Sequence, residues 1–406
     1  NEKTIFPLTK KLEHFINKAQ QKHLLPADIE KLIINIEDEQ ERAFITIANE
    51  TYKKYESEKK RLNKIDFNEI LKTSAEKLGD SKCDIDMKLW SWKINLKYIK
   101  YLIIDEYQDF STLFYMLLET ILKYNPTCKL FFVWDSWQSI NAFAGSEIWY
   151  FFDFQKLFSS TTEKKISTNY RSFQSIVEMW NTLMKSEWTW KAKWLSPIHD
   201  WWQETTFIDI SRIHPCNNEI INSIFREWDD RRTLKQAKYA FTKIINILKN
   251  NKKKKIMFIS RNNRVFWHIL FDLRMKLYQY YFTIWLKNTK IDIVKNTSNL
   301  DNKIHKDDIE RYKDLNKYFE DNLEFITAHK SKGKEADIVV LLDIDEKKYP
   351  SNEKSLKWDI KYDRIFGITE ESLLSDEKRL FYVAITRAKE KLYIISEEKK
   401  NTRLYQ

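Results

Sequence analysis

The chain has 406 residues, and 43% of them are hydrophobic, which fits a folded globular protein with two or three domains and sizeable cores. The formal net charge of +11 favours a polyanionic partner, although frequent Lys, Asn and Ile residues are also typical of an AT-rich genome. The cysteines, Cys83, Cys128 and Cys216, lack metal-ligand spacing, no apolar run reaches the roughly 18 residues of a membrane span, and the polar start carries no signal peptide. We therefore expect a cytoplasmic protein without disulfides, structural zinc, an iron–sulfur cluster or a membrane segment.

Residues 1–95 predict a helical region. Apolar residues recur at three- and four-residue spacing, for example at Phe44, Ile47, Ala48 and Tyr52, and charged residues fill the positions between them. This pattern is typical of amphipathic helices that bury one face. We expect these helices to form an accessory subdomain.

Two short apolar runs after residue 95 predict neighbouring strands of a parallel sheet. The run 98–104, YIKYLII, is followed by Asp105 and Glu106, and the run 128–133, CKLFFV, is followed a few residues later by Gln138. The segment between the runs is apolar on one face, as in the crossover helix of a βαβ unit. Polar residues after buried strands lie where an open parallel sheet binds its ligand.

The pair Asp105 and Glu106 suggests nucleotide hydrolysis with a metal ion. A carboxylate at a strand end can hold Mg²⁺ against phosphate oxygens, and its neighbour can accept a proton from the attacking water. Adjacent carboxylates are also common in solvated turns, and the chain has 59 acidic residues. The pair alone therefore leaves both interpretations open.

The second half of the chain predicts another α/β region. An amphipathic helix is expected around 237–248, and the basic run NNKKKK at 250–255 is either a solvated loop or a contact for phosphates. The strands expected here are 206–210, 255–261 and 391–395.

Ordered motifs along the chain carry a family resemblance. LIIDEYQDFS, VWDSWQSINAFAGS, TNYRS, FITAHKSKGKEADIVVL and EKRLFYVAITRAKEKLYI follow one another between residues 102 and 394. Together they resemble motifs II to VI of the UvrD/Rep-like superfamily 1 DNA helicases, and the second and fourth are most similar to the helicase IV branch. The resemblance implies an α/β fold with two RecA-like parallel-sheet lobes. Its implied regions are a helical insertion subdomain at 1–95, a partial first lobe at 96–203, and a second lobe at 204–406 with a minimal insertion at about 262–322.

The resemblance also implies an activity, which is ATP-dependent helicase or translocase action. The expected direction is 3′ to 5′ on single-stranded DNA, or on DNA with a single-stranded tail, in repair or replication. ATP and Mg²⁺ are the implied ligands. The implied catalytic and nucleotide-binding residues are Asp105 for Mg²⁺, Glu106 for activating water, Gln138 as γ-phosphate sensor, Arg171 and the arginine finger Arg387 at the γ-phosphate, and Gly333 and Glu335 at the nucleotide.

The DNA contacts implied by the resemblance are Phe143, Thr327, His329 and Lys330. Phe143 would stack on bases, and the other three would lie at the DNA backbone. If the order of the motifs is left aside, the local sequence predicts a surface residue at Arg171 and an ordinary loop histidine at His329. The sequence departs from the family pattern at Asn141, where Tyr is common, and at Lys334, where Leu is usual.

The phosphate-binding sequence GxxxxGK[ST] occurs nowhere in the chain. The simplest interpretation is truncation at the N-terminus, and we then expect no appreciable ATP hydrolysis by these 406 residues alone. The alternative is a catalytically inactive helicase-like module that binds DNA or a protein partner. A motor attached to a nuclease, as in RecB-like or AddA-like enzymes, is a third possibility, but no nuclease carboxylate cluster is present.

The balance of glycine and tryptophan is unusual, with 4 Gly and 15 Trp. Trp134 stands where the helicase motif has Gly, and Trp188, Trp190 and Trp194 lie among small polar residues. One hypothesis is that UGA codons for glycine were translated as tryptophan; the two residue types pooled give an ordinary glycine content. The alternative is that these tryptophans are core or base-stacking residues. Trp137 is expected to be genuine, because the helicase IV-like motif has Trp there.

Overall fold

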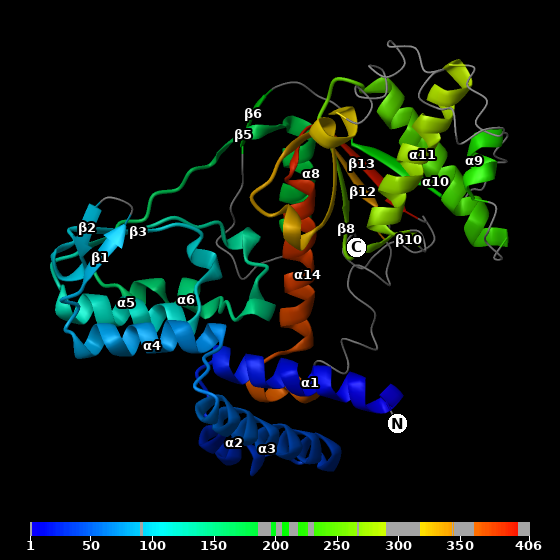
Figure 1. Ribbon diagram of the computed structural model, residues 1–406. Helices are drawn as coiled ribbons and strands as arrows, with labels where there is room; N and C mark the ends of the chain where they lie inside the picture. The colour runs from blue at the N-terminus through cyan, green and yellow to red at the C-terminus, as the bar shows by residue number, and fades with distance from the viewer. Residues whose placement is uncertain are drawn as a thin grey trace, which may run out of the picture. The chain divides into compact units, whose positions relative to one another are not determined.

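The protein is described here from a computed structural model, shown in Figure 1. The residues it describes are 2–89, 92–185, 196–199, 205–210, 218–225, 231–265, 268–289, 317–342, 344 and 361–396. The chain forms two compact units. Unit 1 comprises Asn1–Lys164 and Glu353–Arg379, and unit 2 comprises Lys165–Asn352 and Leu380–Gln406. These units divide the chain differently from the three predicted domains, whose limits remain a prediction.

Unit 1 begins with a helical layer. Its helices are α1 (Glu2–Gln21), α2 (Pro26–Ile33), α3 (Glu39–Arg61) and α4 (Phe67–Asp80). The carboxylates of Asp38 and Asp66 cap the amino ends of α3 and α4 by accepting the main-chain N–H groups of Glu41 and Glu69, at 2.8 and 2.9 Å. The helical prediction for 1–95 is confirmed as far as Asp80, but it is wrong for its last ten residues, where two strands, Asp86–Leu89 and Trp92–Asn95, pair antiparallel. The core of the layer contains Phe15, Ile16, Ala19, Ile29, Ile45, Ala48, Tyr52 and Phe366.

The predicted buried face of α3 is partly wrong. Ala48 and Tyr52 are buried, and Phe44 packs against the same core, but Ile47 is 54% exposed. At about 100° per residue, Ile47 lies about 160° from Ile45 and about 100° from Ala48, so it points away from the buried stripe. Spacing by three or four residues relates Ile47 to Phe44 but does not show which face of the helix is buried.

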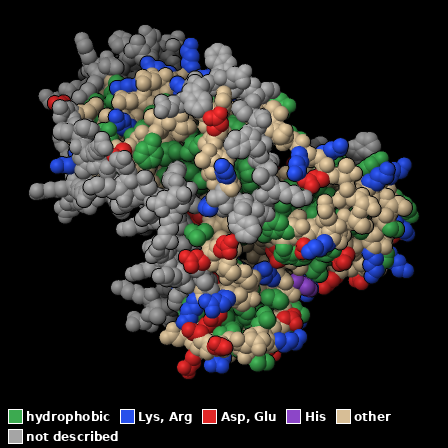
Figure 2. All heavy atoms as spheres, turned by 180° about the vertical axis from the view of Figure 1, so that it is seen from behind, with side chains coloured by type: hydrophobic (Ala, Val, Ile, Leu, Met, Phe, Trp, Pro, Cys, Tyr) green, Lys and Arg blue, Asp and Glu red, His purple; other side chains and the backbone are tan. Residues whose placement is uncertain are grey.

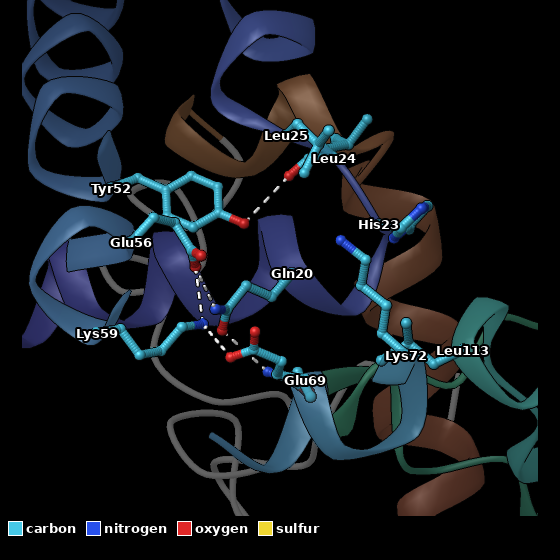
Figure 3. A pocket seen from close by; sticks show the side chains of 11 residues that line it. Gln20, His23, Leu24, Leu25, Tyr52, Glu56, Lys59, Glu69, Lys72 and Leu113 are labelled. Carbon is cyan, nitrogen blue, oxygen red and sulfur yellow. Dashed lines mark hydrogen bonds and ion pairs between the residues drawn. The ribbon is translucent and has the colours of Figure 1, made fainter. Parts of the chain in front are cut away.

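An ion cluster inside the helical layer ties three helices together (Figure 3). The ammonium group of Lys59, on α3, lies 3.0 Å from Glu56 and 2.9 Å from both Asp66 and Glu69. Gln20 of α1 donates to Glu56 and Asp66 at 3.1 and 2.8 Å. Burial alone would lower the pKa of Lys59, but these carboxylates raise it above its ordinary value. The cluster therefore fixes α1, α3 and α4 against one another.

The rest of unit 1 contains the predicted βαβ unit. Strands β3 (Tyr101–Ile104) and β4 (Lys129–Phe132) pair in parallel, with Tyr101 opposite Lys129, and α5 (Thr112–Tyr124) connects them. The parallel pairing confirms that the two apolar runs are neighbouring strands, but their predicted burial is wrong, because Tyr101, Ile103 and Phe131 leave one face of each strand exposed. The smaller elements are the antiparallel pair β1 (Asp86–Leu89) and β2 (Trp92–Asn95), the 3-10 turns η1 (Leu96–Tyr98), η2 (Tyr107–Asp109), η3 (Ser136–Gln138), η4 (Ala142–Ala144) and η7 (Arg364–Phe366), and the short helices α6 (Trp149–Phe152) and α7 (Phe154–Leu157).

Unit 2 is built on a five-stranded parallel sheet with the order β11-β8-β12-β13-β7. Every residue of β8 is buried, as is nearly all of β12, so these central strands are apolar on both faces. The α/β class and the parallel sheets predicted from the sequence are confirmed. The strands are β7 (Thr206–Asp209), β8 (Ile256–Ser260), β11 (Leu323–Thr327), β12 (Ala336–Leu342) and β13 (Ala388–Ser396).

Helices cover both faces of this sheet (Figure 1). On one face, alternate strand residues such as Phe258 and Val340 share a core with α9 (Glu219–Ile224), α10 (Arg231–Asn250) and α11 (Leu270–Thr289). On the other face, Trp180 of α8 (Gln174–Met184) packs on Tyr382 of α14 (Glu370–Ile385), with ring centroids 5.9 Å apart. Among the described residues, unit 2 also contains the parallel pair β5 (Thr168–Phe173) and β6 (Ser196–His199), the short pair β9 (Arg264–Val265) and β10 (His268–Ile269), and the turn η6 (His329–Ser331).

On the face shown in Figure 2, Lys and Arg side chains are interspersed with Asp and Glu side chains over the described part of the surface. Among the residues described, no helix is both long and apolar enough to cross a membrane.

Candidate nucleotide and DNA site

The candidate catalytic carboxylates directly follow β3 in unit 1. The end of this strand is fixed by main-chain hydrogen bonds, from the N–H of Val133 to the carbonyl of Ile104 and from the N–H of Tyr107 to the carbonyl of Val133, both at 2.9 Å. Asp105 and Glu106 are exposed beyond it. The sequence prediction that both carboxylates directly follow a strand is therefore confirmed.

Glu106 has an unusual backbone conformation. Its φ of 54° and ψ of 39° lie in the left-handed region, which a residue with a β-carbon adopts at a cost of about 1–2 kcal/mol. Its own N–H donates to the carboxylate of Asp105 at 2.9 Å. Strained residues of this kind concentrate at functional sites, where the surrounding structure holds them in place.

Gln108 connects the two strand ends. Its side-chain amide donates to the carboxylate of Glu106, and its side-chain oxygen accepts the main-chain N–H of Asp135 at 2.9 Å. Its main-chain carbonyl accepts the hydroxyl of Ser139 at 3.2 Å. The residue is only 2% exposed. Sequence analysis gave Gln108 no role, although its place two residues after Glu106 in DEYQD was the available signal.

Gln138 lies at the end of the same network. Its side-chain amide donates to Asp135 at 2.9 Å, and the other carboxylate oxygen of Asp135 caps η3 by accepting the N–H of Trp137 at 3.2 Å. Glu106 and Gln138 are thus connected through Gln108 and Asp135. The structure brings together the proposed water-activating and phosphate-sensing residues at the carboxyl ends of β3 and β4.

Trp134 is half-buried in an aromatic cluster. Its ring centroid lies 5.2 Å from that of Phe154, 5.7 Å from that of Phe151 and 6.2 Å from that of Tyr107. Its backbone is not in the positive-φ region, so this conformation does not require glycine. Trp137 is buried at 3% exposure, as a core tryptophan would be. Trp188, Trp190 and Trp194 lie outside the described residues.

The proposed base-stacking region is only partly described. Phe143 lies on η4, but its side chain is outside the described part of the structure. Asn141, at the position where the family commonly has Tyr, donates its side-chain amide to Asp109 at 2.8 Å. Asn141 thus attaches the loop after η3 to the loop after β3.

In unit 2, two of the predicted nucleotide residues form an ion pair. Nε of Arg171, on β5, lies 3.0 Å from one carboxylate oxygen of Glu335, and Nζ of Lys389 lies 2.6 Å from the other. Lys389, and then Arg171, hold the pKa of Glu335 below its ordinary value. Glu335 and Lys389 lie where β12 and β13 begin, at the amino edge of the sheet. Lys389 was not predicted as a site residue.

Arg387, the predicted arginine finger, is 1% exposed. Its guanidinium donates to the main-chain carbonyls of Val383 and Lys334 at 2.8 and 3.2 Å and to the hydroxyl of Thr386 at 2.8 Å. The side chain is therefore bonded within unit 2 in this conformation. Its contact with a γ-phosphate remains a prediction, and it requires the guanidinium to leave these acceptors.

The predicted DNA-contacting residues of unit 2 lie at the other end of the sheet. Thr327 is the last residue of β11, and His329 and Lys330 form the turn η6 that follows it. Burial, and then the nearby Arg261, lower the pKa of His329 to about 4, so the imidazole is neutral near pH 7. Lys330 is exposed. Gly333 has a φ of +77° with open space at its Cβ position, as a close approach to a ligand would need.

Comparison with known proteins defines the class. The family model of the UvrD/REP helicase N-terminal domain matches residues 1–159, and that of the UvrD-like helicase C-terminal domain matches residues 281–399. Together these matches cover most of the chain. The protein belongs to the UvrD-like DNA helicase family, as the ordered motifs predicted.

Several curated helicases are similar to the chain. A probable DNA helicase of Mycoplasma pneumoniae is 26% identical over 298 residues, which is 73% of this chain and 44% of that protein. The ATP-dependent DNA helicase Rep of Buchnera aphidicola is 27% identical over 44% of this chain and 25% of its own length. The putative ATP-dependent DNA helicase YjcD of Bacillus subtilis is 30% identical over 37% of this chain and 18% of its own length. The chain thus spans less than half the length of these relatives.

A solved structure is also similar, at 10% sequence identity and a TM-score of 0.26. It is the C-terminal domain of a possible DNA helicase from Lactobacillus plantarum, and the match covers 58% of this chain and 91% of that domain. A TM-score this low adds nothing to the assignment, which depends on the family models and the sequence relatives.

Proposed function

We propose that the chain is the motor region of an ATP-dependent DNA helicase or translocase that moves 3′ to 5′ on single-stranded DNA, in repair or replication. The main support is the hydrogen-bonded network from Glu106 through Gln108 and Asp135 to Gln138, at the carboxyl ends of two parallel strands. A network of this kind sets the orientation of a proton acceptor and of a phosphate-sensing amide relative to each other.

Asp105 is the residue proposed to hold Mg²⁺. Among the described residues no group of at least three His, Cys, Asp or Glu side chains forms a metal site. Mg²⁺ commonly takes one or two protein carboxylates and completes its shell with phosphate oxygens and water, so an exposed aspartate at a strand end fits this ion. When held by Asp105, Mg²⁺ would supply positive charge that neutralises the charge of the phosphates.

The other residues are proposed to act on the substrate ATP directly. Glu106 would accept the proton of the attacking water, and Gln138 would bond the γ-phosphate. Arg171 and Arg387 would offer fixed positive charge to the phosphates, and Glu335 and Gly333 would lie at the nucleoside. In the structure Arg171 is paired with Glu335, so phosphate binding is proposed to compete with that ion pair.

DNA is proposed to bind along Phe143, Thr327, His329 and Lys330. A neutral His329 would contribute a hydrogen bond to a phosphate rather than a charge, because its pKa is lowered to about 4. Lys330 would supply the electrostatic part of the contact. The substrate is proposed to be a single strand or a duplex with a single-stranded tail.

The alternative that we propose is a helicase-like module that binds DNA or a protein partner without hydrolysing ATP. The loop GxxxxGK[ST], whose backbone N–H groups normally hold the phosphates, does not occur in the 406 residues given, so the experiment below must distinguish the two functions.

The decisive experiment is ATP hydrolysis by the product of the source gene, with and without oligothymidine, beside a Glu106→Gln variant. DNA-stimulated hydrolysis that Glu106→Gln abolishes, with DNA binding retained, would support the motor. Tight DNA binding with no hydrolysis in either protein would support the binding module. Hydrolysis that survives Glu106→Gln would refute the role given to this carboxylate.

A further inference from the structure

Arg379, on α14 in unit 1, is a buried arginine to which neither the predicted site nor the proposed mechanism gives a role. Its side chain is 6% exposed. Nε donates to the main-chain carbonyl of Ser139 at 2.7 Å, one terminal nitrogen donates to the hydroxyl of Ser375 at 2.7 Å, and the other pairs with the carboxylate of Asp376. All three branches of the guanidinium therefore have partners.

The partner at Ser139 lies next to the proposed phosphate sensor. Ser139 immediately follows Gln138 and ends the turn η3. It is 5% exposed, and its hydroxyl donates to the main-chain carbonyl of Gln108. The residue after the sensor is thus held on one side by Arg379 and on the other by Gln108.

The other two contacts of Arg379 explain why the guanidinium points at this carbonyl. Ser375 and Asp376 lie four and three residues before Arg379, on the preceding turn of the same helix. They occupy the two terminal nitrogens and leave Nε directed at Ser139. A guanidinium has the fixed planar geometry that such a three-point arrangement needs, and an ammonium group does not.

We propose that Arg379 is a positioning residue for the phosphate-sensing loop. It fixes the carbonyl of Ser139, and through it the main chain from which the Gln138 side chain extends, so that this amide meets the γ-phosphate in one orientation. Arg379 itself touches no nucleotide. The inference builds on the proposed function, since the phosphate-sensing role of Gln138 is part of that proposal.

Two variants and a control test whether Arg379 orders the loop, and this test needs no enzymatic activity. Arg379→Gln removes the charge and the planar set of N–H donors of the guanidinium, and Arg379→Lys keeps the charge but loses the three-point geometry. Arg364→Gln, an exposed arginine in the same unit, is the control. We expect amide hydrogen exchange in the segment 134–146 to rise strongly in Arg379→Gln, less in Arg379→Lys and not at all in Arg364→Gln, with the strands of unit 2 unchanged. Equal exchange of this segment in all four proteins would overturn the proposal.

The kinetics of ATP hydrolysis test whether this positioning matters for function. In the hydrolysing protein, we expect Arg379→Gln to lower kcat by about tenfold or more while leaving KM for ATP nearly unchanged, because the phosphate contact is misaligned rather than removed. Arg379→Lys should recover part of kcat. An unchanged kcat in a folded Arg379→Gln protein would also overturn the proposal. If the wild-type protein hydrolyses no ATP, the proposed function fails, and hydrogen exchange still decides whether Arg379 orders the loop.

Discussion

Gly145, in the loop that follows Gln138, marks a close approach between this loop and the end of α1. Its φ is +89°, and a β-carbon added there would lie 2.8, 2.9 and 3.0 Å from Cβ, Cγ and Cδ of Gln21. The nearby ion pair of Lys22 and Glu147, at 3.2 Å, holds the same two segments together. Gly145→Ala therefore combines an unfavourable backbone conformation with a steric overlap.

The expected loss can be estimated from these two causes. A residue with a β-carbon in the left-handed region costs about 1–2 kcal/mol. Overpacking against atoms close to the main chain of Gln21 adds about 1–3 kcal/mol, since Cβ cannot move away as the end of a side chain can. We expect Gly145→Ala to lower the free energy of unfolding by about 2–5 kcal/mol.

Gly367 offers a matched control in the same unit. Its φ is +78°, but nothing lies within 4 Å of the position of an added β-carbon. Gly367→Ala should therefore cost only the backbone part, about 1–2 kcal/mol. Urea unfolding followed by far-ultraviolet circular dichroism measures both variants. If Gly145→Ala is no more destabilising than Gly367→Ala, the packing of α1 against this loop is not as described.

Three further predictions concern single side chains. The pKa of His329 is lowered to about 4 from 6.5, so the neutral imidazole stabilises the folded state above pH 6.5, and this contribution is lost as the pH falls toward 4. His329→Gln should flatten that part of the pH dependence of urea unfolding, and an unchanged profile would contradict the assignment. Lys389→Gln should raise the pKa of Glu335 but lower stability by less than about 1 kcal/mol, because the pair is well exposed; a larger loss in urea unfolding would contradict this estimate. Trp134→Gly should cost about 3 kcal/mol if tryptophan is native, since its ring packs on Tyr107 and Phe154, and a gain in stability, with UGA as the source codon, would instead support recoding of glycine.

The sequence was sufficient to predict the fold class and the strand-end carboxylates. Strands of the parallel sheets appear as continuous apolar runs, even in β3, which has one exposed face. Polar residues that follow such a run must lie at the sheet edge, so Asp105 and Glu106 could be placed from local pattern. The family was predicted from the order of the motifs, and the comparisons confirm it. The helicase IV branch and the roles of individual site residues remain predictions.

Features that depend on tertiary contacts could not be predicted from the sequence. Nothing local shows that Arg387 is buried against the carbonyl of Lys334, because that contact joins segments 53 residues apart. The contact of Arg379 with Ser139 spans 240 residues, so no local pattern reveals it. Lys389 follows the motif arginine by two residues, but only the pairing of β12 with β13 brings it to Glu335.

The direction of the strands in unit 2 has a mechanical consequence. Glu335 and Arg387 precede β12 and β13 at one edge of the sheet, whereas Thr327 ends β11 at the opposite edge. The seven residues of β12, at about 3.3 Å each, separate the edges by about 20 Å. Under the proposed function, ATP and DNA would never touch each other across this distance. The close-packed central strands deform little, so the sheet would move as a rigid body. A rotation of the sheet at the nucleotide edge would then displace the DNA strand at the opposite edge.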